Sequence, residues 1–196
     1  MVRMSSVDLE QRLSFEERHT LLGVARRSID EGLRAGTPLE VDVAEYAGQL
    51  REMRACFVTL RMADDALRGC IGSSEAVRPL VADVAHNAWA AANSDPRFDP
   101  LRPEEFAALH VHISVLSPLE PLPAKSEEEL LEHIRPGIDG LLVQEGSQRG
   151  TLLPAVWESL PDARRFLYEV RRKAGLPGNY WSASLSFSRY TAESFD

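Results

Sequence analysis

Two runs of alternating residues, separated by only four positions, restrict the fold of this chain more than any other feature. Residues 54–62 (RACFVTLRM) and 67–72 (LRGCIG) are rich in residues that favour strands. The intervening residues 63–66 (ADDA) have the composition of a turn. Because a connection this short joins antiparallel neighbours, the sequence predicts a β-hairpin over residues 54–72.

Helices of unequal length are predicted on both sides of the hairpin. Ser14 and Glu17 have the spacing of a capping box, apolar residues then recur at helical spacing, and Gly36 is expected to end the helix. Further helices are predicted from residues 79, 104 and 126 and over 161–174, and further strands over 110–116, 141–145, 151–153 and 185–190. Paired strands between unequal helices are typical of an α+β fold with mostly antiparallel strands.

Composition narrows the class of protein. The chain has 196 residues, of which 44% are hydrophobic, so we expect a single domain over residues 1–196 that buries a core. The formal net charge of -8 argues against nucleic acid or an anionic membrane as a general partner. Residues 1–8 contain no apolar run typical of a signal peptide, and two cysteines make no disulfide framework, which favours a cytoplasmic location.

Cys70 carries the sharpest chemical hypothesis. It lies between Gly69 and Ile71, directly after Arg68, and a neighbouring guanidinium favours the nucleophilic thiolate. Gly69 and Gly72 would allow either a ligand or another backbone to approach closely. The alternative is a buried strand cysteine that acts as a small hydrophobic residue, and Cys56 fits that description better still.

Three other groups of polar residues are weaker candidates. In the loop DPRF, Arg97 either holds an anionic ligand or pairs with Asp95 or Asp99, with Phe98 in the core. His110 and His112 share one strand face, but no third metal ligand has the required spacing, so we expect solvent-facing histidines and no metal. The basic residues of 164–173 are expected to form a solvated helix face.

Seven short segments together resemble one known family. They are FVTL (57–60), LRGCIG (67–72), DPRF (95–98), SVLSP (114–118), GIDGLLV (137–143), RGTLLP (149–154) and KAGLP (173–177). In order and spacing this set is similar to the AMMECR domain family, whose prokaryotic members are called AmmeMemoRadiSam system protein A. LRGCIG is the family's signature, and the resemblance covers about residues 15–195.

The resemblance implies an α+β fold with a larger and a smaller lobe and the signature near a cleft between them. It implies no established activity and no known cofactor, while the family name points to Memo-like and radical-SAM proteins as partner candidates. The matched polar residues lead us to expect a cationic cleft that binds a small anionic ligand. Its candidates are Cys70 as the catalytic residue and Arg68, Gly69, Gly72, Asp95, Arg97, Arg149 and Lys173 as ligand-binding residues. We weigh a small-molecule enzyme or ligand-binding protein against a non-catalytic scaffold component of that pathway.

Overall fold

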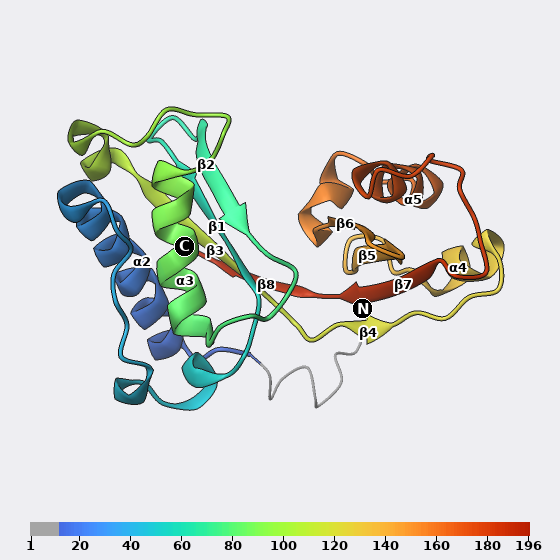
Figure 1. Cartoon of the computed structure of the whole chain (residues 1–196), viewed down its shortest axis with the longest axis horizontal. Helices are drawn as coiled ribbons and strands as arrows, with labels where there is room; N and C mark the ends of the chain where they lie inside the picture. Colours follow the sequence, from blue (N-terminus) through green and yellow to red (C-terminus); the bar gives the residue numbers. More distant parts are fainter. Residues whose placement is uncertain (1–11) are drawn as a thin grey trace. The chain divides into compact units, whose positions relative to one another are not determined.

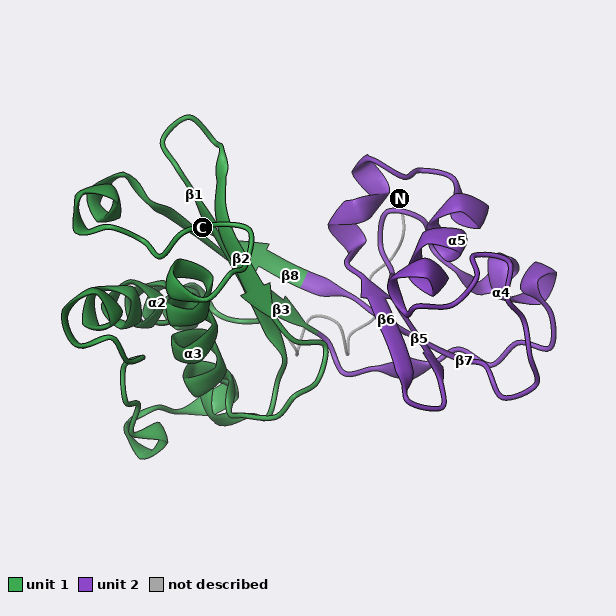
Figure 2. Ribbon diagram, turned by 45° about the horizontal axis from the view of Figure 1, so that its top comes forward, with its two compact units in different colours: residues 1–116, 193–196 green, residues 117–192 purple. Residues whose placement is uncertain are grey.

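A computed structural model describes residues 12–196, and the first eight residues, where no signal peptide is expected, lie outside them. The chain divides into two compact units (Figure 2). Unit 1 comprises residues up to Leu116 together with Glu193–Asp196, and unit 2 comprises Ser117–Ala192. The expectation of a single domain stays a prediction, as do the lobes and the cleft.

Unit 1 is a four-stranded sheet with two long helices on one face (Figure 1). The sheet order is β2-β1-β3-β8, and β1 pairs antiparallel with both β2 and β3. The bounds are α2 (Phe15–Ala35), β1 (Cys56–Arg61), β2 (Leu67–Gly72), α3 (Leu80–Asn93), β3 (His110–Leu116) and β8 (Ala192–Phe195), with 3-10 turns η1 (Val43–Glu45), η2 (Gly48–Arg51) and η3 (Pro103–Ala108).

Local sequence signals explain the helix ends in unit 1. The Ser14 side chain accepts a hydrogen bond from the Glu17 N–H and the Glu17 side chain accepts from the Ser14 N–H, so the predicted capping box begins α2. Gly36 ends the helix in the left-handed conformation, with φ of 75°. α3 is apolar on most of its surface and is buried between α2 and the sheet.

Unit 2 repeats the two-layer arrangement with a smaller sheet. Its strand order is β4-β7-β5-β6, all antiparallel, and α5 packs on one face. The bounds are β4 (Glu120–Pro121), α4 (Glu127–His133), β5 (Gly140–Glu145), β6 (Gln148–Leu152), η4 (Pro154–Glu158), α5 (Ala163–Lys173) and β7 (Ser186–Tyr190). The two units bury separate apolar clusters, so each has its own core.

The α+β class and the antiparallel pairing are confirmed. The strands of the predicted hairpin are confirmed too, with a register shift between Leu60 and Arg61. The structure adds β4 and β8, which are too short to show a period in the sequence. The expected helix from residue 104 is a 3-10 turn, and the second hairpin turns over Gly146 and Ser147 rather than over five residues.

Candidate functional site

The signature strand β2 has two different faces. A Cβ atom on Gly69 would meet the carbonyl oxygen of Ala91 far inside van der Waals contact, so Gly69 faces α3. Because side chains alternate along a strand, Arg68 and Cys70 project from the opposite face, which we call the outer face. Gly72 similarly abuts the backbone of Cys56 and Phe57. Both glycines are therefore needed for the approach of another backbone.

Cys70 is half-buried on the outer face, directly across from Thr59 of β1. The Thr59 hydroxyl donates a hydrogen bond to the Cys70 sulfur over 3.2 Å. On the other side of Thr59, His112 of β3 occupies the matching position.

The backbone of Cys70 is held by the DPRF loop. The Cys70 N–H donates to Asp95 Oδ2 over 2.8 Å, and Arg97 Nη2 donates to the Cys70 carbonyl over 3.4 Å. Asp95 and Arg97 also pair with each other, through Arg97 Nε on Oδ1 at 2.9 Å and Nη2 on Oδ2 at 2.7 Å. The hydrogen bonds from Arg97, with those from backbone N–H groups, hold the pKa of Asp95 well below its usual range.

This arrangement has a topological meaning, because β2 is an edge strand. The N–H and C=O of Cys70 point away from β1, which makes Cys70 and Thr59 a non-hydrogen-bonded pair with closely spaced side chains. A further strand would need those two backbone groups. Asp95 and Arg97 already occupy both of them, so the two side chains take the place of a neighbouring strand at this one residue.

Part of the Arg97 guanidinium group, its Nη1 edge, is not used by the contacts with Asp95 and Cys70. The Arg97 side chain is 53% exposed, whereas that of Asp95 is 2% exposed. Within residues 12–196, Nη1 of Arg97 makes no hydrogen bond. A cation is thus fixed beside Cys70 by a buried carboxylate, with one donor edge still available to a ligand.

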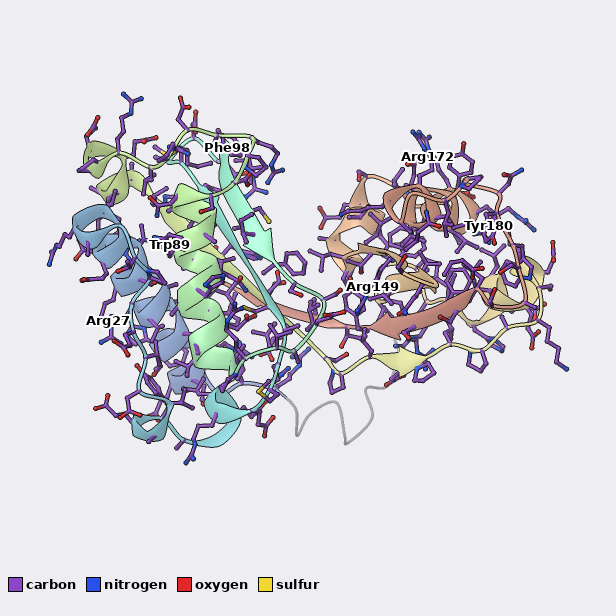
Figure 3. All side chains as sticks on the ribbon, in the orientation of Figure 1. Arg27, Trp89, Phe98, Arg149, Arg172 and Tyr180 are labelled. Atoms are coloured by element: carbon purple, nitrogen blue, oxygen red, sulfur yellow. The ribbon has the colours of Figure 1, made fainter. Side chains whose placement is uncertain are left out.

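Arg68, in contrast, has a side chain that is only 12% exposed. Its Nε and Nη2 donate to the two carboxylate oxygens of Glu105 over 2.7 and 3.1 Å, and Nη2 also donates to the Asp99 carbonyl. These hydrogen bonds lower the pKa of Glu105 to about 2. The ring of Phe98, which Figure 3 labels, lies against both guanidinium groups, and its centroid is 5.9 Å from the guanidinium carbon of Arg68 and 5.5 Å from that of Arg97. Phe98 is not part of the core cluster.

The remaining two cation candidates belong to unit 2 and are separated within it. A Cβ on Gly150 would meet the backbone of Ala174, so Gly150 faces α5 and Arg149 projects from the opposite face of that sheet. Lys173 is on α5 itself and lines a depression on the helix side. Figure 3 labels Arg149 at the sheet and Arg172, the neighbour of Lys173, at α5. A cationic cleft shared by Arg149 or Lys173 with Cys70 stays a prediction.

Cys56 occupies the helix-covered side of the same sheet. It is fully buried, its sulfur donates to Asp83 Oδ2 over 3.3 Å, and Asn87 donates to its carbonyl. Burial raises the pKa of Cys56 well above its ordinary value. The expected description of Cys56 as the blander cysteine agrees with these surroundings.

His110 is exposed and His112 half-buried, beside the buried Val111 and Ile113. No group of three or more metal-ligating side chains occurs within residues 12–196. In the same part of the chain, no helix has the length and apolarity to cross a bilayer.

Sequence reasoning missed Thr59 and Glu105. A signal for Thr59 existed, because a hairpin that turns over residues 63–66 places residue 59 opposite residue 70. Glu105 had no such signal, since its partner Arg68 is 37 residues earlier and the intervening loop fixes their approach.

Comparisons with known proteins agree on one family. The AMMECR1 family model matches residues 22–195. A protein from Methanothermobacter thermautotrophicus is 40% identical over 189 residues, covering 93% of this chain and 95% of the relative. One from Thermotoga maritima is 34% identical over 178 residues, covering 90% and 97%. The crystal structure of an uncharacterised protein from Pyrococcus horikoshii is 38% identical, with a TM-score of 0.79 over 89% of this chain and 88% of the other.

Proposed function

Because the chain belongs to the AMMECR1 family, we propose that its signature strand builds a binding site for a small anionic molecule, with Cys70 as contact residue or nucleophile and Arg97 as anion-binding group. The observation that carries the proposal is the joint fixation of Cys70 and Arg97 by Asp95. Asp95 holds the Arg97 guanidinium against the Cys70 carbonyl without using all of the guanidinium donors.

The electrostatics of this cluster support an anion more than a cation. Asp95 is buried and compensated by Arg97, while the exposed part of the pair is the guanidinium. A ligand that approaches the Cys70 sulfur therefore meets a positive group before a negative one. Arg68 contributes less, because its side chain is only 12% exposed.

The experiment compares the alkylation rate of Cys70 by iodoacetate, an anion, with that by neutral iodoacetamide, read by mass spectrometry. Both reagents need the thiolate, so their rate ratio reports the local potential rather than the reactivity of the sulfur. We expect Arg97→Ala to lower the iodoacetate-to-iodoacetamide ratio about threefold at low ionic strength. Cys56 is the internal control and is expected to react only on unfolding, since it is fully buried.

Arg61→Ala is the matched control variant. Arg61 is on the neighbouring strand β1, further from Cys70, so its removal should lower the ratio less than Arg97→Ala does. If the iodoacetate-to-iodoacetamide ratio were equal in the wild type and in Arg97→Ala, Arg97 would not be an anion-binding residue of this site. A Cys70 that stays as unreactive as Cys56 in the folded protein would make Cys70 a packing residue.

A non-catalytic role within a complex is the second candidate, and the edge position of β2 favours it. Leu67 at the start of β2 is 36% exposed and offers an apolar contact at this edge. In this alternative, Memo-like and radical-SAM proteins of a cytoplasmic pathway dock on the signature strand. Co-purification with those two proteins, lost in Leu67→Asp while the alkylation ratio of Cys70 is kept, would support docking over ligand binding.

A further inference from the structure

A depression in unit 2 has no role in the site around Cys70. It has a volume of about 590 Å³ and lies between α5, the end of β6 and the segment after η4. Its apolar lining includes Leu152 and Leu160, and its charged lining consists of Arg165, Glu169, Arg172 and Lys173. All of these residues belong to unit 2, so the depression is complete within one unit.

The cations of α5 fall into two sets with different partners. Arg164 and Arg171 both pair with Glu127, at 3.2 and 2.8 Å. Their neighbours in the sequence, Arg165 and Arg172, lie about 100° further around the helix and line the depression instead.

The positive charges of the set at the depression are only partly balanced by carboxylates. Arg172 is 3.9 Å from Glu169, at the limit of an ion pair. Within residues 12–196, Arg165 and Lys173 have no carboxylate within 4.0 Å. Three cations with one carboxylate leave a local positive charge in a protein whose net charge is -8.

We propose that this depression is a second ligand site, which binds a small phosphorylated molecule with an apolar part. The phosphate is held by Arg165 and Lys173, since guanidinium and ammonium groups are the usual partners of phosphate oxygens. The apolar part rests on Leu152 and Leu160, which a hydrated inorganic ion would leave uncovered. The site is independent of the proposed function at Cys70.

Calorimetric titration at low ionic strength with phenyl phosphate and with inorganic phosphate tests both parts of the proposal. We expect phenyl phosphate to bind about tenfold more tightly, because the ring covers the two leucines. Arg165→Ala and Lys173→Ala should each weaken phenyl phosphate about fivefold. Leu160→Ser should reduce the preference for phenyl phosphate over phosphate and leave phosphate binding unchanged.

Arg164→Ala is the matched control, since Arg164 is the adjacent cation on the same helix but pairs with Glu127. Equal weakening by Arg164→Ala and Arg165→Ala would overturn the proposal, because the helix would then act as a diffuse charge. Equal affinity for the two phosphates, or the absence of saturable binding, would also overturn it. A single-stranded oligonucleotide that binds more tightly than phenyl phosphate, through Arg164, would overturn it as well, because that result indicates a nucleic-acid surface.

Two further measurements keep these outcomes interpretable. Unchanged thermal unfolding of the variants excludes misfolding, and an unchanged alkylation ratio of Cys70 excludes an effect through the site in unit 1.

Discussion

The two cysteines belong to one sheet but differ in the face from which they project, in burial and in the hydrogen bonds of their sulfur atoms. Cys56 on β1 faces the helices, is fully buried and contacts the buried Asp83. Cys70 on β2 projects from the outer face, is half-buried and receives a hydrogen bond from Thr59. An aspartate accompanies each. Asp83 accepts hydrogen bonds from both the backbone N–H and the sulfur of Cys56, whereas Asp95 accepts only from the backbone N–H of Cys70 and leaves the sulfur accessible to a hydroxyl donor.

The difference teaches that burial and hydrogen bonding, more than residue type, decide what a cysteine can do in this sheet. On the helix side, burial and a carboxylate next to the sulfur raise the pKa of the Cys56 thiol. On the outer face the Cys70 sulfur is only half-buried and accepts a hydrogen bond from a hydroxyl. Four measurements extend or break this comparison, from the largest effect on the molecule to the smallest.

Gly69→Ala should have the largest effect. The added methyl would overlap the Ala91 carbonyl, and neither α3 nor β2 can move without disturbing the core. We expect a loss of about 3 kcal/mol in the free energy of unfolding, or no folded protein, as measured by chemical denaturation. Gly23→Ala on α2 is the control, since a methyl there meets no atom within 4 Å and should be neutral or stabilising. A fully stable Gly69→Ala would mean that the two layers are not packed this tightly.

Asp83→Ala should come next, because it removes the acceptor shared by Cys56 and Asn87. The carboxylate is fully buried and pairs with Arg78, whose side chain is 40% exposed, so the loss should be about 2 kcal/mol. Denaturation by urea measures it. Alkylation of Cys70 in the native state should not change, and a changed rate would show that the two faces are coupled.

Asp95→Asn should destabilise the protein by about 1 kcal/mol at neutral pH, since Arg97 is more than half exposed. The sign of its pH dependence follows from the lowered pKa of Asp95. The folded carboxyl stays ionised at lower pH than the unfolded one, which titrates near ~3.9, so its stabilisation is complete above that value and is lost on further acidification. Stability measured from pH 7 to pH 2 should therefore fall less steeply in Asp95→Asn.

Asp99→Asn is the control for this pH series. Asp99 is exposed in the same loop, and the hydrogen bond that it makes with Arg68 uses its backbone carbonyl rather than its carboxylate. An acid profile that Asp99→Asn alters as much as Asp95→Asn would assign the effect to the general charge of the loop.

Thr59→Val should have the smallest effect on stability and a specific effect on chemistry. Loss of one neutral hydrogen bond to sulfur should lower the free energy of unfolding by on the order of 1 kcal/mol. The same variant should slow alkylation of Cys70 by iodoacetamide about threefold. Ser114→Ala, on the same face but bonded to Ser194, should leave the rate unchanged. Equal rates in Thr59→Val and the wild type would reduce the hydroxyl to a packing neighbour.

The sequence predicted the hairpin, the two long helices and the α+β class because periodicity and capping are local signals. It also offered, as an alternative, the pairing of Arg97 with Asp95, two residues away. The contact of Arg68 with Glu105 and the separation of Arg149 from Lys173 depend on how distant segments pack, which spacing does not encode. Asp83 and Asn87 could have been noticed, since they are polar residues one turn apart on an otherwise apolar helix.

The hydrogen bonds of Asp95 and Arg97 with the edge of β2 form late in synthesis, because both residues follow that strand in the chain. Asp95 follows Cys70 by 25 residues, so during synthesis the hairpin emerges with its outer edge unprotected until α3 and the next loop have been added. In that interval the signature strand is free to pair with the edge of another chain. The DPRF loop is therefore the segment that protects this edge at Cys70, and it does so only after synthesis has passed Arg97.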